Sequence, residues 1–268
     1  MKYNKKLSVQ LRLSEYLFDS RKLDVNYSIA RVMLSKIGNI HDITIEEIAY
    51  CAHTSPSSVT KFCKGLGYAS FKSLKADQSQ FEYADAFQDM VLISNTRGID
   101  AAFHFFVEEH KKKMLEIFRF FEHQQISRIA QQLNKAKSGA VFSGIHGFAS
   151  SNFFLEAASY YDISLCEINR TADTSMIQTI METENIIFII SLTGAWMDYL
   201  INEVEIKPDL VEKIVLITYE DSEKYKNYCK EIVSCKDIRE FFSSNYYSST
   251  AMSMLFLLFV LSINEKGI

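Results

Sequence analysis

The feature that most constrains this chain is the stretch from Thr44 to Leu66, which has the pattern of two short amphipathic helices. Apolar residues recur twice at the spacing of one buried helical face. They are Ile45, Ile48, Ala49 and Ala52 in the first half, and Val59, Phe62, Cys63 and Leu66 in the second. Helices this short need a partner for their apolar stripes. The stretch therefore predicts two helices that pack on each other.

Residues that fix helix ends stand at the start of both halves. Thr44 followed by Glu47 is a capping box for the first helix, and Ser55 followed by Pro56 is an N-cap and N1 proline for the second. His53 falls in the short turn between them, where we expect a left-handed backbone conformation. Two capped helices joined by a sharp turn are the anatomy of a helix-turn-helix.

The outer face of the second predicted helix is small, polar and basic, because its hydroxyls and lysines fall opposite or beside the apolar stripe. A DNA major groove admits one helix, whose side chains can hydrogen-bond base edges or phosphates, and a helix N-terminus can meet a phosphate. The predicted DNA-binding residues are Ser55, Ser57, Ser58, Thr60, Lys61 and Lys64. The alternative interpretation is a bundle helix whose outer face merely contacts water.

Charge is divided unevenly along the chain. Residues 1–80 hold twelve Lys or Arg against seven Asp or Glu, a net charge of plus five, and residues 81–268 hold seventeen against twenty-six, a net charge of minus nine. This asymmetry favours a polyanion partner for the first part only. With 268 residues, 48% of them hydrophobic, the chain is large and apolar enough for two domains or one large one.

Several classes of protein are disfavoured. The N-terminus lacks the apolar region and cleavage site of a signal peptide, and the longest apolar run, 251–263, is shorter than the roughly 20 residues that cross a bilayer. We expect that run to be a buried helix and the protein to be cytoplasmic, without a membrane partner. The five cysteines show neither CxxC spacing nor a neighbouring histidine at zinc-ligand spacing, so we expect buried reduced thiols, no metal and no cofactor.

Weaker helical patterns surround the helix pair. Before it we expect helices over 6–18 and 27–37, the second capped by Asn26 and ended by Gly38 and Asn39. After it, Tyr68, Phe71 and Leu74 predict a short helix that closes an all-α bundle near residue 80.

A looser stretch follows the bundle. Residues 77–98 are interpreted as a connector, and long helices are predicted over 100–123 and 125–136. The three lysines at 111–113 are interpreted as the solvent-facing side of the first of these helices rather than as a nucleic-acid patch.

Beyond residue 138, short β-rich runs alternate with helical segments. The candidate strands are 140–142, 164–168, 186–190, 214–217 and 231–233. The intervening candidate helices are 150–161, 175–181, 196–205 and 222–228. Buried strands separated by helical crossovers indicate a doubly wound parallel α/β sheet. We therefore divide the chain into a helix-turn-helix domain at 1–80, a linker and connecting helix at 81–123, and an α/β domain at 124–268.

Two loops at the predicted carboxyl edge of this sheet are candidate ligand-binding sites. In the first, glycines between a strand and a helix allow backbone N–H groups to approach an anion, and in the second, hydroxyls and a glycine precede a helix. The predicted ligand-binding residues are Ser143, Gly144, His146, Gly147, Ser191, Thr193, Gly194 and Trp196. The alternative is that the second set simply caps the next helix. We predict no catalytic residues, because His146 has no visible carboxylate partner.

The segment from Thr44 to Lys75, which reads TIEEIA, SPSSVTKFCKGLGY and FKSLK, closely resembles the DNA-binding segment of the RpiR family of bacterial transcriptional regulators. The order of elements agrees over nearly the whole chain. The resemblance implies a C-terminal sugar isomerase (SIS) domain that binds a phosphosugar effector, a homodimer or higher homo-oligomer, and a palindromic double-stranded DNA operator in a sugar-metabolism operon.

The effector loops depart from the family pattern. His146 and Phe148 stand where a second glycine and a serine are expected, and Trp196 stands where a threonine is expected. Two interpretations stay open. Either the effector site is retained in altered form and uses His146 and Trp196, or the SIS domain has lost its ligand and serves for dimerisation. A sugar-phosphate isomerase is the third hypothesis, disfavoured by the missing acid/base pair.

Overall fold

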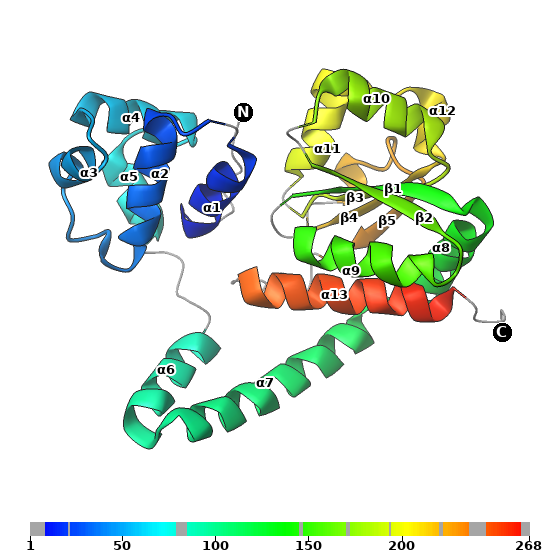
Figure 1. Ribbon diagram of the computed structural model, residues 1–268, viewed down its shortest axis with the longest axis horizontal. Helices are drawn as coiled ribbons and strands as arrows, with labels where there is room; N and C mark the ends of the chain where they lie inside the picture. The colour runs from blue at the N-terminus through cyan, green and yellow to red at the C-terminus, as the bar shows by residue number, and fades with distance from the viewer. Residues whose placement is uncertain are drawn as a thin grey trace. The chain divides into compact units, whose positions relative to one another are not determined.

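The computed structural model describes residues 9–20, 22–78, 85–144, 147–169, 172–192, 194–219, 222–235 and 245–263. The chain divides into two compact units, residues 1–82 and 83–268 (Figure 1). Helices at 85–97 and 99–120 belong to the second unit. The finer division at residues 80 and 123 stays a prediction.

The first unit is a small bundle of helices around one apolar core. Its helices are α1 (Val9–Asp19), α2 (Val25–Ser35), α3 (Ile45–Cys51), α4 (Pro56–Gly65) and α5 (Phe71–Gln78), with a 3₁₀ turn at Ile37–Asn39. Both apolar stripes of the helix pair enter this core, since Ile48, Val59 and Cys63 are buried together with Ile29 and Met33 of α2. Burial of the stripes therefore holds α3 and α4 against the rest of the bundle.

A buried arginine joins three helices of this unit. Arg12 of α1 is fully buried, donates through Nη1 to the carbonyl of Leu66 at 3.4 Å, and lies 3.8 Å from the carboxylate of Asp77. Its guanidinium also lies over the ring of Tyr68, whose hydroxyl donates to Asp77 at 2.6 Å. Burial lowers the pKa of Arg12, and these neighbours offset part of that cost.

The second unit is a parallel sheet covered on both faces. The strands β1 (Ser138–Ser143), β2 (Ser164–Asn169), β3 (Ile187–Ile190), β4 (Ile214–Thr218) and β5 (Glu231–Ser234) lie in the order β2-β1-β3-β4-β5. Every described strand pairing in this sheet is parallel. This is the doubly wound order that reverses direction between β1 and β3.

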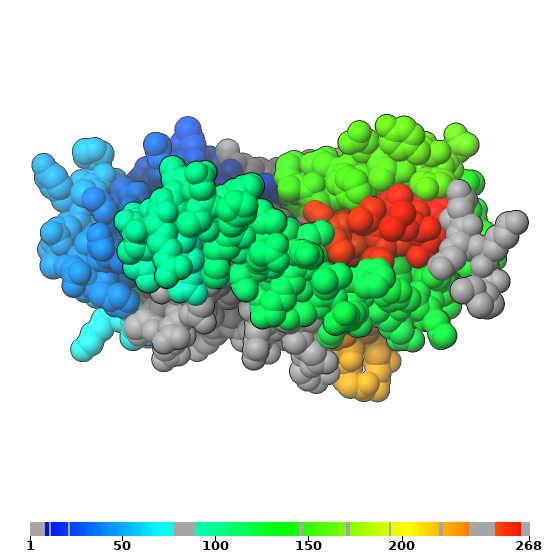
Figure 2. Space-filling model, turned by 90° about the horizontal axis from the view of Figure 1, so that it is seen from below, coloured from blue at the N-terminus to red at the C-terminus, as the bar shows by residue number. Residues whose placement is uncertain are grey.

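Helices cover the two faces of this sheet in two groups (Figure 1). One face carries α8 (His123–Ala136), α9 (Phe148–Ser159) and α13 (Asn245–Ser262); the other carries α10 (Thr174–Thr183), α11 (Ala195–Tyr199) and α12 (Pro208–Val211). Helices α6 (Asp85–Arg97) and α7 (Ile99–Phe120) pack on each other, and α7 also contacts α13. Figure 2 shows α13, in red, between green segments of the same unit.

Four phenylalanines form the centre of the α8, α9 and α13 face. Phe154 of α9 stacks on Phe256 of α13 with ring centroids 4.6 Å apart and meets Phe188 of β3 edge-on at 5.3 Å. Phe259 contacts both Phe154 and Phe188. Because these rings come from the sheet and from two helices, they hold α9 and α13 to the strands.

The predicted fold class is confirmed: an all-α helix-turn-helix bundle precedes a doubly wound parallel-sheet domain. Each predicted strand overlaps one observed strand, and the predicted and observed ends differ by at most two residues. The apolar run at 251–263 is a buried helix, extended at its start to Asn245.

Other helix predictions were wrong in detail. Residues 85–97, assigned to the connector, form α6, whose apolar residues follow no single stripe. The cap of α2 is Asp24, whose side chain accepts from the N–H of Tyr27 at 2.9 Å, and not Asn26. That helix also ends at Ser35, before Gly38. Residues 222–228 form only a 3₁₀ turn at Ser222–Lys224 and further turns, and the short helix α12 was not predicted.

All five cysteines are free. Burial raises the pKa of Cys63 and of Cys229 to about 12, so both thiols stay protonated at neutral pH. Cys51 is an exception to the expected burial, because it lies exposed on α3. In the part of the chain that the structure describes, no helix is long and apolar enough to cross a membrane.

Replacing Phe154 by Ala should lower the free energy of unfolding of the second unit by about 3–5 kcal/mol, because the substitution removes a fully buried ring. Urea unfolding followed by the fluorescence of Trp196 measures this, since it is the only tryptophan in the chain and belongs to this unit. Phe153→Ala is the matched control, because Phe153 is the neighbour on α9 and is 39% exposed. Equal losses in the two variants would contradict the assigned core.

Candidate functional site

The turn between α3 and α4 has the geometry that the sequence predicts. Thr44 accepts from the N–H of Glu47 at 3.2 Å, and the Glu47 carboxylate accepts from the N–H of Thr44 at 2.7 Å, which completes the capping box. These hydrogen bonds lower the pKa of Glu47. His53 has a φ of 51°, in the left-handed region. The start of α3 and the turn that directs α4 are thus both set by local interactions.

Different residues hold the start of α4 and the segment that precedes α3. At the start of α4, Ser55 accepts from the N–H of Ser58 at 3.3 Å, and Pro56 is the first helical residue. Ahead of α3, Lys75 of α5 donates to the carbonyls of His41 and Ile43 at 2.8 and 3.0 Å. Lys75 therefore belongs to the framework of the motif.

The outer face of α4 divides into engaged and available groups. Thr60 donates to the carbonyl of Pro56 at 3.0 Å, so its hydroxyl serves the helix, as that of Ser55 does. Ser57, Lys61 and Lys64 are exposed, and neither lysine has an ion pair among the described residues. The Ser57 hydroxyl shares a hydrogen bond with that of Ser55 at 2.8 Å. The groups most available to an external ligand are therefore the two cations, Lys61 and Lys64.

The first loop of the α/β unit begins at the end of β1. Ser143 is fully buried there, and its hydroxyl donates to the carboxylate of Glu167 on β2, which also accepts from the hydroxyl of Ser151 on α9. The structure thus brings together two serines and an acid that the sequence placed apart. His146 lies outside the described residues.

The two glycines of this loop differ in their surroundings. A Cβ at Gly144 would meet nothing within 4 Å, so this position faces open space. A Cβ at Gly147 would lie 2.7 Å from the side chain of Ile190 and 3.1 Å from Cβ of Ser143. Gly147 therefore packs closely on the strand ends, and a side chain there would have to displace that of Ile190.

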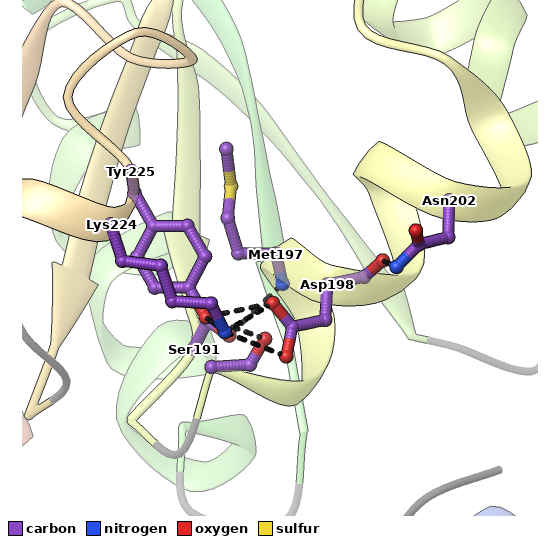
Figure 3. Close-up of polar contacts among 7 residues, drawn as sticks. Ser191, Met197, Asp198, Asn202, Lys224 and Tyr225 are labelled. Carbon is purple, nitrogen blue, oxygen red and sulfur yellow. Dashed lines mark hydrogen bonds and ion pairs between the residues drawn. The ribbon is translucent and has the colours of Figure 1, made fainter.

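The second loop joins β3 to α11. Ser191 is buried, and its hydroxyl accepts from the N–H of Met197 at 3.1 Å, across the start of the helix (Figure 3). Gly194 takes a φ of 79° at the N-cap, a conformation that a side chain would strain. Ser191 and Gly194 thus both contribute to the start of α11. Thr193 lies outside the described residues.

Trp196 faces the apolar core. Its side chain is 2% exposed, and its ring meets Phe142 of β1 edge-on at 5.4 Å and Tyr199 at 5.9 Å. Its indole Nε1 has no hydrogen-bond partner among the described residues. The indole ring therefore belongs to the apolar core beneath α10 and α11. The one polar group that it could offer to a ligand is the buried N–H at Nε1.

A charged cluster beside the second loop was missed by sequence reasoning. Asp198 of α11 pairs with Nζ of Lys224 at 2.7 Å and accepts from the hydroxyl of Tyr225 at 2.9 Å (Figure 3). Tyr225 is fully buried, whereas Lys224 and Asp198 are each about half exposed. The sequence does show that Lys224 follows β4, and ligands of such sheets bind beyond the carboxyl ends of the strands. The prediction of a helix over residues 222–228 hid this cluster.

Within the described ranges, no three histidine, cysteine, aspartate or glutamate side chains lie close enough to hold a metal ion.

A capped helix pair with an exposed basic second helix, attached to a doubly wound α/β unit, defines a helix-turn-helix protein with a separate C-terminal unit.

Comparison with known proteins specifies the family of this domain. Residues 21–83 match the family described as the helix-turn-helix domain of the rpiR family. Residues 21–83 are therefore similar to the helix-turn-helix domain of the rpiR family. The match begins after α1 and ends just beyond α5.

No curated protein sequence gives a significant match. Among solved structures, the chain is similar to the NanR protein of Vibrio vulnificus complexed with ManNAc-6P, with 12% identity and a TM-score of 0.47. The alignment covers 96% of this chain and 91% of that one. Nothing about the ligand of this chain follows from a likeness at that level.

Replacing Ser55 by Ala should weaken α4 by about 0.5–2 kcal/mol, because the N-cap acceptor is lost. Ser57→Ala is the matched control and should change stability by less than about 0.5 kcal/mol, since Ser57 is exposed and bonds only the Ser55 hydroxyl, which keeps the N–H of Ser58 when Ser57 is truncated. Hydrogen exchange of the α4 amides, followed by mass spectrometry on the full chain, measures both. The assignment of the cap fails if the two variants exchange at the same rate.

Proposed function

We propose that this protein regulates a sugar-metabolism operon by inserting α4 into the major groove of an operator. The observation that carries the proposal is the exposed face of Ser57, Lys61 and Lys64, held outward by a helix whose opposite face is buried. Hydroxyl and ammonium groups on a groove-sized helix suit both phosphates and base edges. The net positive charge of residues 1–80 supports attraction to DNA.

We propose further that the α/β unit receives a sugar or sugar-phosphate effector at the carboxyl edge of its sheet. Support comes from the doubly wound order, which concentrates the loops after β1, β3 and β4 at that edge. Gly144 faces open space there, and the half-exposed ion pair of Lys224 with Asp198 lies beside the second loop. A homodimer on a two-fold symmetric site completes the proposal, because helix-turn-helix proteins read paired half-sites in this way. A dimeric regulator without an effector is the alternative, favoured by the use of Ser191 as a helix cap.

Lys61→Ala and Lys64→Ala should each weaken binding to DNA from the region upstream of the protein's own gene. If the lysine contacts a phosphate, the slope of log affinity against log salt concentration should fall by about one. If it reads a base, affinity should fall for that sequence and discrimination against others should relax. Fluorescence anisotropy across a salt titration separates these roles.

Lys112→Ala is the matched control, because Lys112 is an exposed lysine of α7 in the other unit, and it should leave both affinity and slope unchanged. Absence of binding by the wild type at low salt, or identical binding by the wild type and Lys61→Ala, would refute DNA reading by α4.

An effector should change the DNA affinity of the full chain, and a panel of sugars and their phosphate esters tests this in the same anisotropy assay. Thermal shift without DNA gives the companion measurement, since a ligand in hundredfold excess over its Kd stabilises by about 2.7 kcal/mol. A panel that alters neither quantity would favour the effector-free alternative.

A further inference from the structure

The strongest unassigned feature is the exposed side of α7, the helix of 22 residues that precedes α8. Its other side is already packed, since α6 lies against it and Ile117 near its end joins the core beneath α13 (Figure 1). The exposed side carries apolar residues at helical spacing, which we call the α7 face: Ile99, Phe103, Val107, Leu115 and Phe118. This face is therefore not part of the core of its own unit.

The α7 face is more apolar and more continuous than ordinary protein surface. Ile99 is 78% exposed, Phe103 62% and Leu115 49%. Single exposed apolar side chains are common, whereas five on one side of one helix form a connected stripe of the kind that marks an interface. Covering the stripe would remove apolar area from water, which is the main driving force for association.

The charged residues on the same side of α7 are ordered by sign along the helix. Asp100 and Glu108 lie in the first half, and Lys111 and Arg119 lie in the second. All four are exposed, and none has an ion pair within the described ranges. The order is also symmetric, because the acids lie as far before the midpoint between residues 109 and 110 as the two cations lie after it.

This symmetry matches the α7 face to a second copy of itself. A two-fold axis through the midpoint places the helices antiparallel, with Glu108 beside Lys111 of the second copy and Asp100 beside its Arg119. The same operation brings Phe103 toward Leu115 and Phe118 of that copy. A parallel arrangement would instead set like charges side by side, which is unfavourable. A self-complementary patch of this kind is what a two-fold symmetric dimer requires.

We propose that the α7 face packs antiparallel on the α7 face of a second copy of this chain. The inference rests on the proposed function for the existence of a homodimer, and it adds the surface and the orientation of the contact. Lys112 lies about 100° around the helix from Lys111, at the edge of this surface, and takes no part in the contact.

Phe103→Glu tests the apolar part of the contact. It should raise the dimer Kd at least about tenfold, because a charge enters the stripe, and sedimentation equilibrium on the full chain measures this. Met176→Glu is the matched control and should leave the dimer unchanged, since Met176 is 50% exposed on α10, on the other face of the sheet. Circular dichroism checks that both variants are folded.

A charge exchange tests the antiparallel orientation. At low salt, Glu108→Lys should raise the dimer Kd about tenfold, because the new lysine faces Lys111 of the second copy at two symmetric places. Adding Lys111→Glu should restore the dimer, since opposite charges face each other again. The double variant has the net charge of the wild type and so serves as its own control. The difference should disappear at 1 M salt, where charges are screened.

Three results would overturn the inference. They are a Phe103→Glu variant that is as dimeric as the wild type, a double variant that is as weak as Glu108→Lys, and a wild type that is monomeric. The first two leave the proposed dimer in place on another surface. DNA binding is measured separately, so its absence would refute the regulator and leave a confirmed α7 contact intact.

Discussion

Burial of the central strands on both faces is the constraint on which the α/β unit depends. All residues of β3 and β4 are buried, as are all but the first residue of β1. Such strands must be covered by helices on both faces of the sheet. In a parallel sheet, each crossover helix carries the chain from the carboxyl end of one strand back to the amino end of the next. The same constraint gathers the loops after β1, β3 and β4 at one edge. The candidate effector region is thus a consequence of how the core is buried.

The helix-turn-helix motif is fixed by interactions between residues close in sequence, whereas the sheet is fixed by interactions between residues far apart in sequence. Thr44, Glu47 and Ser55 act within three residues of their partners, and His53 sets the turn through its own backbone. The polar outer face of α4 follows from those local choices once its apolar stripe is buried. In the second unit, by contrast, Ser143 and Ser191 at the strand ends hydrogen-bond groups of the protein itself.

The same division decides how much could be predicted from sequence. Caps and apolar stripes are local, so α3, α4 and the turn between them were predicted correctly, and short apolar runs located each strand that the structure describes. Helix α6 was missed because it lacks an apolar stripe, and Asn26 was chosen as a cap over Asp24 because both are good capping residues two positions apart. The meeting of Ser143, Ser151 and Glu167 depends on strand register, which periodicity does not encode. Asp198 and Lys224 meet for the same kind of reason, through a contact between loops of different strands.

The buried Arg12 has a consequence for where the first unit begins. The segment that matches the family starts at residue 21, yet Val9 and Leu13 of α1 lie in the same core, and Arg12 connects α1 to the end of α4 and to α5. A fragment cut at the start of the family match would lose this cation, leave Asp77 without its buried counter-charge and expose the apolar side of α2. The compact unit is therefore longer than the segment that matches the family, and its first helix is held to the rest of the bundle by the packing of Val9 and Leu13 and by the guanidinium of Arg12.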